Sequence, residues 1–266
     1  MRAVASVPHA APVAGPPGAA TPSAAALGVD IETLITEDDT PVDMRSEKQQ
    51  RLLTSPLYSS WSGPGGGRTF LAAANVGIFP EPRNPAIVPD VFVSLDVQVH
   101  ENRLEKAHRS YFVWEFGKPP DLVVEILLNQ KDNEVRRKRQ RYAQMGVRYY
   151  VIHDPLSRVM DELLRVYRLS GGGYERRESH WFPELRLGLT LWDGVFEAVR
   201  SRWLRWVDEH DAVIPTGREL ADEQHLHIET PHRRAERAER LLTEERQRAE
   251  RLAALLRRSG IDPEQD

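Results

Sequence analysis

The feature that most constrains this 266-residue chain is a strand–helix–strand pattern in its middle. Residues 121–128, Asp-Leu-Val-Val-Glu-Ile-Leu-Leu, have the composition of a buried strand, and residues 133–145 have the spacing of a helix. Gly146 is placed to end that helix in a left-handed conformation, and residues 148–153 form a second strand, which an Asp-Pro pair stops. This spacing predicts a mixed sheet flanked by helices. The expected fold class is therefore α/β or α+β.

Other stretches of the chain add strands and one more helix around this unit. The expected strands are rich in Val, Ile, Phe or Tyr and are bounded by Pro, Gly or Asn. Two of them form a hairpin across a run of three glycines. The expected elements are the strands 87–94 and 111–116, the hairpin strands 163–169 and 174–178, and a short polar helix over residues 44–53.

The two ends of the chain differ in composition from its middle. Residues 1–28 contain ten Ala, five Pro and three Gly without any acidic residue, which predicts a disordered leader. Residues 29–228 leave room for a single globular domain, and residues 229–266 form a charged helical tail. A run rich in Arg and Glu without Gly or Pro follows Pro231, so we expect a long helix from about Pro231 to Arg258.

The tail has a 3-4 spacing of residues that could form the seam of a coiled coil. The members of this seam are Ala235, Ala238, Leu242, Glu245, Ala249, Leu252, Leu256 and Ser259. Alanines, a glutamate and a serine give the seam little apolar area, so we expect a homodimer through the tail to be weak at most. One alternative interpretation places the function of the protein in this helix, as an assembly protein.

Composition and charge exclude several classes of protein. With 36 Lys and Arg against 40 Asp and Glu, the formal charge is −4, so any contact with nucleic acid must come from a local patch. The chain has no cysteine, which excludes disulfides, thiolate metal sites and a cysteine nucleophile. No apolar run approaches the ~20 residues of a membrane helix. We expect a cytoplasmic protein without membrane contact.

Two carboxylates stand inside otherwise apolar strands. Asp90 lies in Ala-Ile-Val-Pro-Asp-Val-Phe-Val, and Glu125 has apolar neighbours on both sides in its own strand. An ionised carboxylate in such surroundings is costly unless it is paired or binds a metal. Each one alone could instead be a strand-end residue capped by a backbone amide or an arginine. Two such strands in one domain favour a shared metal site.

The helix over residues 133–145 has one charged residue on its apolar stripe. Val135, Lys138, Tyr142 and Met145 recur at spacings of three and four, and the lysine is the only charged member. Either its ammonium reaches solvent while its stem covers apolar surface, or it points at the two carboxylates. The second interpretation is favoured because the helix closely follows the strand of the second carboxylate. Flanking arginines are expected to contact nucleic-acid phosphates, namely Arg136, Arg137, Arg139 and Arg141.

Two carboxylates and a lysine near one sheet edge suit metal-assisted hydrolysis of phosphodiesters. Asp90 and Glu125 would supply the hard oxygen ligands that Mg²⁺ prefers, with Mn²⁺ as a substitute. Lys138 would orient or help deprotonate the attacking water, or stabilise the transition state. We therefore expect these three to be the catalytic residues, with Asp90 and Glu125 as the metal ligands.

The same residues carry a resemblance to a known family. Pro-Asp90, Glu125 within Val-Val-Glu-Ile-Leu, and the segment 133–155 resemble the Uma-two family of restriction endonucleases, in the PD-(D/E)XK nuclease superfamily. The similarity covers residues 43–219. It implies a restriction-endonuclease-like fold and a Mg²⁺-dependent DNA endonuclease in which Asp90 and Glu125 are the metal-binding acids. It also implies that Lys138 is the superfamily lysine, displaced from the strand to the following helix.

One position departs from the superfamily pattern. That pattern has a lysine two residues after the acidic residue of the strand, and Leu127 stands there. Activity therefore depends on Lys138 taking the place of that lysine. The alternative is a catalytically inactive nuclease-fold module that binds nucleic acid or a protein partner.

Overall fold

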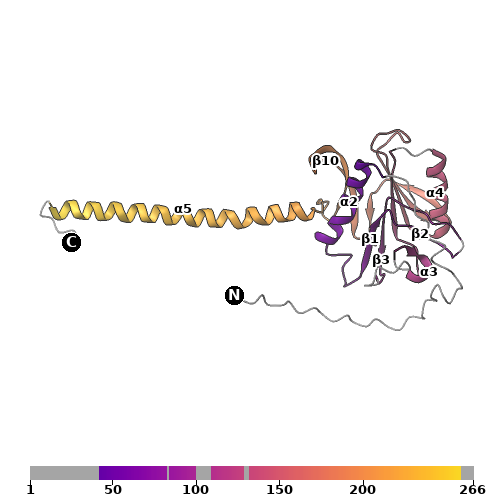
Figure 1. Cartoon of the computed structure of the whole chain (residues 1–266), viewed down its shortest axis with the longest axis horizontal. Coiled ribbons are helices and arrows are strands. Elements are labelled where there is room, and N and C mark those ends of the chain that lie inside the picture. The colour runs from indigo at the N-terminus through magenta and orange to yellow at the C-terminus, as the bar shows by residue number, and fades with distance from the viewer. Residues whose placement is uncertain (1–41, 83, 100–108, 129–131, 259–266) are drawn as a thin grey trace.

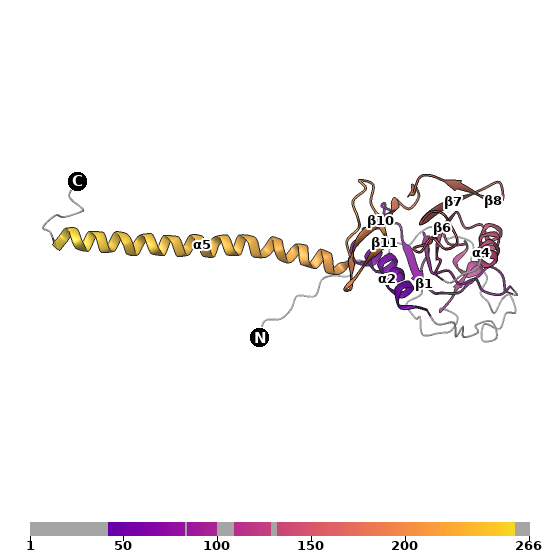
Figure 2. The same cartoon turned by 90° about the horizontal axis from the view of Figure 1, so that it is seen from above.

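The structure, a computed structural model, describes residues 42–82, 84–99, 109–128 and 132–258. A domain built around a β-sheet occupies one end of the molecule, and the long helix α5, Gly217–Arg258, projects from it (Figure 1). The view from above shows the same arrangement (Figure 2). The leader predicted over residues 1–28 lies outside the described residues. Within the described ranges, no helix is long and apolar enough to span a membrane.

In the described residues, six strands form the main sheet, in the spatial order β1 (Phe70–Ala74), β3 (Val91–Leu95), β5 (Leu122–Ile126), β6 (Tyr149–His153), β7 (Leu164–Ser170) and β8 (Gly173–Arg177). β5 and β6 are parallel, and the other neighbours are antiparallel. The sheet is therefore mixed, and helices flank it. This confirms the expected fold class.

The strand–helix–strand unit predicted from the sequence forms the centre of the main sheet. Helix α4, Asp132–Met145, connects β5 to its parallel neighbour β6. Gly146 follows the helix with a φ of 89°, a conformation that glycine adopts without a Cβ clash. The hairpin of β7 and β8 also forms as predicted, with Gly171 and Gly172 in left-handed conformations at its turn.

Two separate cores lie on the two faces of the main sheet, because side chains alternate along each strand. One core contains Val123 of β5 with Val135 and Tyr142 of α4. The layer on the other face consists of α2 (Met44–Ser59), β9 (Trp181–Phe182), β10 (Leu187–Phe196) and β11 (Val199–Val207). There Val124 of β5 packs in one cluster with Leu53 of α2. Glu125 shares the face of Val123 and therefore lies under α4.

The segment 111–116, predicted as one strand, forms two elements instead. Only β4, Tyr111–Phe112, is extended, and it pairs in parallel with β2, Ile78–Phe79. The chain then enters the short helix α3, Val113–Phe116. The aromatic rings of the first and last residues of the segment stack with their centroids 4.2 Å apart. A continuous strand would hold those two rings ~17 Å apart on opposite faces, so the stacking requires the turn.

Two of the predicted elements differ from the structure by several residues at one end. β3 begins at Val91 rather than at Ile87, and Pro89 between them has no N–H to donate to a sheet. The helix predicted over residues 44–53 continues to Ser59. Neither difference moves Asp90 or Glu125 away from the end of the central strands where both lie.

Helix α5 begins at Gly217, well before the predicted start near Pro231. A capping box explains this start. The N–H of Glu219 donates to Thr216 Oγ1 at 3.2 Å, and the N–H of Thr216 donates to the Glu219 carboxylate at 2.7 Å. Glu219 also pairs with Arg205 of β11, which ties the first turn of α5 to the second layer of the domain.

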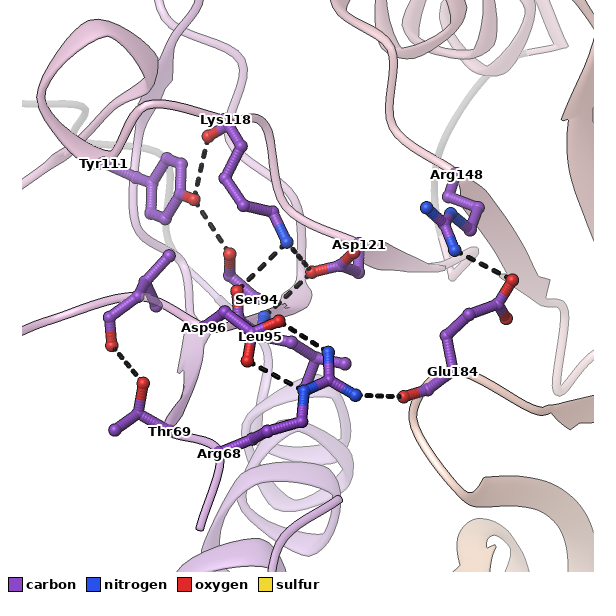
Figure 3. Close-up of polar contacts among 11 residues, drawn as sticks. Arg68, Thr69, Ser94, Leu95, Asp96, Tyr111, Lys118, Asp121, Arg148 and Glu184 are labelled. Carbon is purple, nitrogen blue, oxygen red and sulfur yellow. Dashed lines mark hydrogen bonds and ion pairs between the residues drawn. The ribbon is translucent and has the colours of Figure 1, made fainter. Parts of the chain in front are cut away.

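A polar network surrounds the start of β5 (Figure 3). Asp121, directly before β5, accepts a hydrogen bond from the backbone N–H of Leu95 at 2.8 Å and pairs with Lys118. The Lys118 ammonium also donates to the carbonyl of Leu95 at 3.0 Å. Arg68, just before β1, pairs with Asp96, just after β3. These contacts connect the start of β1, the end of β3 and the start of β5, at the end of the strands opposite Glu125.

Candidate active site

Glu125 is the buried carboxylate at the centre of the candidate active site. Its side chain has 0% exposure and lies in β5 on the face that α4 covers. One carboxylate oxygen accepts a hydrogen bond from the Lys138 ammonium at 2.8 Å, and the other accepts one from the Tyr142 hydroxyl at 2.7 Å. Because the two donors are four residues apart, they share one side of α4. The helix therefore meets the strand carboxylate with both donors at once.

The orientation of Lys138 answers the question that the sequence left open. Its ammonium donates to Glu125 and also to the backbone carbonyl of Val88 at 3.0 Å, and 18% of the side chain is exposed. The ammonium therefore faces the carboxylate rather than bulk water. The predicted stripe of α4 packs toward the sheet, with Val135 and Tyr142 buried on either side of the lysine.

Burial raises the pKa of Glu125 to about 7. The positive charge of Lys138 lowers this pKa, the negative charge of Asp90 raises it, and the hydrogen bonds from Lys138 and Tyr142 lower it. The effect of burial outweighs that of the paired lysine. Burial also raises the pKa of the Tyr142 hydroxyl well above its ordinary value, so the phenol keeps its proton and remains a donor. The site thus holds a carboxylate that additional positive charge would stabilise.

Asp90 lies directly before β3 and is held from two sides. One of its oxygens accepts a hydrogen bond from the backbone N–H of Ile126 at 2.7 Å, and the other accepts one from the side-chain amide of Gln50 at 2.8 Å. Burial raises the pKa of Asp90, while these two hydrogen bonds lower it. Since Ile126 directly follows Glu125 in β5, the two carboxylates lie at the same end of the central strands of the main sheet.

The carboxylate oxygens at this end of the strands are ligands of the kind that Mg²⁺ prefers. Each oxygen of Asp90 and Glu125 accepts one hydrogen bond, and a carboxylate oxygen has a second lone pair with which to bind a cation. In proteins Mg²⁺ is commonly held by one or two carboxylates together with waters and substrate phosphates. The part of the chain that the structure describes contains no group of three or more His, Cys, Asp or Glu that could hold a metal ion. A Mg²⁺ ion held by these two carboxylates would therefore take most of its other ligands from water or substrate.

The four arginines of α4 differ in their contacts. Arg136 and Arg137 are exposed. Arg139 is also exposed, and its guanidinium lies over the ring of Tyr167, 5.5 Å from the ring centre. Arg141 donates to two backbone carbonyls in the loop before β3 and so holds that loop against α4. Contact of these arginines with nucleic acid stays a prediction.

Three polar residues of the site were not predicted as members of it. Tyr142 is predicted only as part of the apolar stripe, and Gln50 and Asn75 stand out by neither charge nor motif. Gln50 reaches Asp90 from α2, and its amide pairs with the amide of Asn75, which follows β1. The sequence holds one signal for Gln50. It stands three residues before Leu53, so both side chains lie on the same side of a helix, which predicts a buried position for Gln50.

The mixed sheet brings two carboxylates and a lysine to one end of its central strands. The Uma2 family model, described as "Putative restriction endonuclease", matches residues 35–195, which is more than half of the chain. The chain therefore belongs to this family. Asp90, Glu125 and Lys138 all lie within the matched range.

Two further comparisons were made with known proteins. A crystal structure from Anabaena variabilis, titled as that of "a putative nuclease belonging to DUF820", is similar with 19% sequence identity and a TM-score of 0.36. The match covers 55% of this chain and 73% of that chain. A search of curated proteins found no match.

Proposed function

We propose that this protein is an endonuclease that hydrolyses phosphodiester bonds of DNA with Mg²⁺, or Mn²⁺, as its cofactor. The observation that carries the proposal is the fully buried carboxylate of Glu125, which Lys138 and Tyr142 hold one residue before the N–H of Ile126 that binds Asp90. Because burial raises its pKa to about 7, an ionised Glu125 lowers the stability of the folded protein. Such a cost is expected where a residue is kept for chemistry. Membership of the Uma2 family supports the same function.

The residues of the site have separate roles in this proposal. Asp90 and Glu125 would hold the cation through their carboxylate oxygens. When bound, Mg²⁺ lowers the pKa of a coordinated water and neutralises charge on the scissile phosphate. Lys138 fixes one oxygen of Glu125 and brings a positive charge to the end of the strands where the phosphate would lie. Tyr142 fixes the other oxygen and, because its phenol stays protonated, does not act as a base.

The surroundings of Leu127 support Lys138 as the substitute for the usual strand lysine. Leu127 is 1% exposed and packs in the core between the main sheet and α4. Lys138 approaches the same strand from α4 and contacts the acidic residue directly. A lysine is thus present at the carboxylate, although it comes from another element. This favours an active enzyme over a nuclease-fold module without turnover.

DNA binding is assigned to the exposed arginines of α4. Since the net charge of the chain is −4, attraction to DNA has to come from a local patch. Arg136, Arg137 and Arg139 are exposed on the helix that also carries Lys138, so they would contact phosphates near the scissile one. Such contacts are independent of sequence and weaken as salt increases.

The proposal is tested with the purified full chain on supercoiled plasmid, linear duplex and single-stranded DNA, each with Mg²⁺, Mn²⁺ or EDTA. We expect cleavage that requires the divalent cation. Lys138→Met should lower the cleavage rate by about 10²-fold. The control Lys48→Met removes an ammonium that pairs with Glu197 on the other face of the domain, and it should leave the rate unchanged. Absence of cleavage on every DNA form with both metals would overturn the proposal and favour the module without turnover.

A further inference from the structure

We infer that Gln50 is a positioning residue for Asp90, whose carboxylate it orients in the cation site with the help of Asn75. The inference rests on the proposed function and extends it to α2. This helix lies on the face of the main sheet opposite α4. Both layers of the domain would therefore contribute to the site.

The side chain of Gln50 is buried and its amide is fully hydrogen-bonded. It is 3% exposed. Its Nε2 donates to Asp90 Oδ1 at 2.8 Å and to Asn75 Oδ1 at 3.1 Å, and its Oε1 accepts from Asn75 Nδ2 at 2.6 Å. A buried amide is costly unless its donors and acceptor are satisfied. Here both hydrogens and the oxygen have partners, so the amide has one defined orientation.

Hydrogen-bond chemistry fixes which end of each amide faces which partner. An ionised carboxylate accepts hydrogen bonds and cannot donate them, so the nitrogen of Gln50 faces Asp90. The other hydrogen and the oxygen of Gln50 then pair with the oxygen and the nitrogen of Asn75. This reciprocal contact would break if either amide rotated by half a turn.

The backbone holds Asn75 in its place beside Asp90. Asn75 has a left-handed φ of 53°, which asparagine adopts more readily than most residues. Its N–H donates to the backbone carbonyl of Asp90 at 3.2 Å. The end of β1 thus aligns Gln50, and Gln50 aligns the carboxylate.

Asp90 is consequently clamped at both oxygens. The N–H of Ile126 holds Oδ2 from β5, and Gln50 holds Oδ1 from α2. Without Gln50, the carboxylate could rotate while it keeps its single bond to Ile126. Partners that orient a metal ligand in this way typically contribute 10- to 100-fold in metal affinity or activity.

The neighbouring Gln49 is a matched control. It is 2% exposed in the same helix, and its amide bonds to the backbone of Leu204 in β11 at 2.8 and 3.0 Å. Gln49→Leu and Gln50→Leu therefore remove the same buried group from adjacent positions. Only the second substitution removes a hydrogen bond to Asp90.

The first test compares these variants in the full chain by cleavage of plasmid DNA. Per folded molecule, Gln50→Leu should lower the Mg²⁺-dependent rate by about 10- to 100-fold. It should also raise the Mg²⁺ concentration that gives half the maximal rate, and leave the KM for plasmid unchanged. Gln49→Leu should keep the wild-type rate per folded molecule. A wild-type rate in Gln50→Leu would overturn the inference, whereas a wild-type protein that cleaves no DNA would overturn the proposed function.

Asn75→Gly provides a second variant in case Gln50→Leu does not fold. Glycine keeps the left-handed backbone and removes the amide that aligns Gln50. It should lower the rate in the same direction as Gln50→Leu. An unchanged rate in Asn75→Gly would contradict the aligning role of Asn75.

A further measurement needs no activity and no metal. Urea unfolding of the wild type, Gln50→Leu, Asp90→Ala and the double variant reports whether the two residues are coupled. We expect the double variant to lose less stability than the sum of the single losses, because the two groups are partners. When Gln49→Leu replaces Gln50→Leu in this cycle, the losses of unfolding free energy of the two single variants should add up to the loss of the double variant. Additivity between Gln50 and Asp90 would overturn the inference even if the enzyme cleaves DNA.

Discussion

The two ends of β5 each carry a carboxylate paired with a lysine, but in different settings. At the start, Asp121 pairs with Lys118, three residues earlier in the chain. Near the end, Glu125 pairs with Lys138 from α4. Asp121 also accepts a hydrogen bond from the backbone N–H of Leu95 in the neighbouring strand (Figure 3), whereas the second donor to Glu125 is a phenol of α4.

On the proposed function, the pair at the start of β5 serves folding and the pair near its end serves chemistry. Removing Asp121 would break a contact between neighbouring strands of the main sheet. Glu125 is held by two side chains of a helix, and burial still raises its pKa to about 7, so the charge is unfavourable for folding at neutral pH. The proposed function accounts for a carboxylate that lowers stability and is nevertheless held in one orientation.

The largest effect is expected for Glu125→Gln on catalysis. The substitution keeps the shape of the side chain and removes the charge that would hold the cation. Nicking of supercoiled plasmid with Mg²⁺ should slow by about 10²- to 10³-fold, the range found for groups that stabilise a charged transition state. A variant that nicks at the wild-type rate would remove Glu125 from the cation site.

The same substitution should change the pH dependence of stability. The pKa of Glu125 is about 7 in the folded protein, against 4.5 as its ordinary value, so the folded state binds this proton more tightly. Its contribution to stability therefore falls as the pH rises from 4.5 to 7, by about 3 kcal/mol in total. In urea unfolding, the stability of Glu125→Gln relative to wild type should increase by that amount over this range.

The comparison with wild type is needed because another buried group titrates in the opposite direction. Burial lowers the pKa of His153, at the end of β6, to about 4 from 6.5. The folded protein disfavours this proton, so stability is lost as the pH falls from 6.5 through 4. The difference between Glu125→Gln and wild type cancels this contribution. A difference that does not vary with pH would show that Glu125 keeps its ordinary pKa.

A smaller effect, on folding alone, is expected at the start of β5. Asp121→Asn keeps the size of the side chain and removes the charge shared by Lys118 and the N–H of Leu95. The free energy of unfolding should fall by about 2 kcal/mol, as for other hydrogen bonds to buried charged groups. Urea unfolding measures the loss, and the cleavage rate per folded molecule should stay unchanged.

The smallest effect is expected when α5 is shortened. Leu242 and Leu252 of its outer part are 55% and 53% exposed, and its first turn is tied to the domain through Glu219 and Arg205. A chain that ends at residue 227 keeps that turn, so its free energy of unfolding should stay within about 0.5 kcal/mol of the full chain. Light scattering of both chains should show at most a weak dimer. A tight dimer lost on truncation would place a strong interface in the seam, and one that persists would place it in the domain.

The fold was predictable where local signals are strong. The unit of β5, α4 and β6 has apolar strands and a terminating Gly146, and the turn of the hairpin of β7 and β8 has glycines. The hairpin of β10 and β11 was not predicted. Its turn places Glu197 and Ala198 at φ values of 45° and 65°, positions that glycine or asparagine usually occupy, so the sequence lacks the usual turn signal.

The candidate site was predictable where a charge stands against an apolar background. Glu125 in a Val- and Ile-rich strand and Lys138 on an apolar stripe are of this kind. Gln50 and Asn75 are neutral, and Gln50 lies 25 residues from Asn75 and 40 residues from Asp90 in the chain. Their contact depends on how α2 packs beside the end of β1, which no local pattern specifies.

The division between the two ends of β5 is tested most directly by measuring Asp121→Asn and Glu125→Gln side by side. For each variant at neutral pH, the cleavage rate per folded molecule is compared with the free energy of unfolding. We predict that Asp121→Asn loses stability and keeps its cleavage rate, whereas Glu125→Gln loses cleavage and gains stability. A Glu125→Gln variant that unfolds more easily and still cleaves DNA would contradict the account.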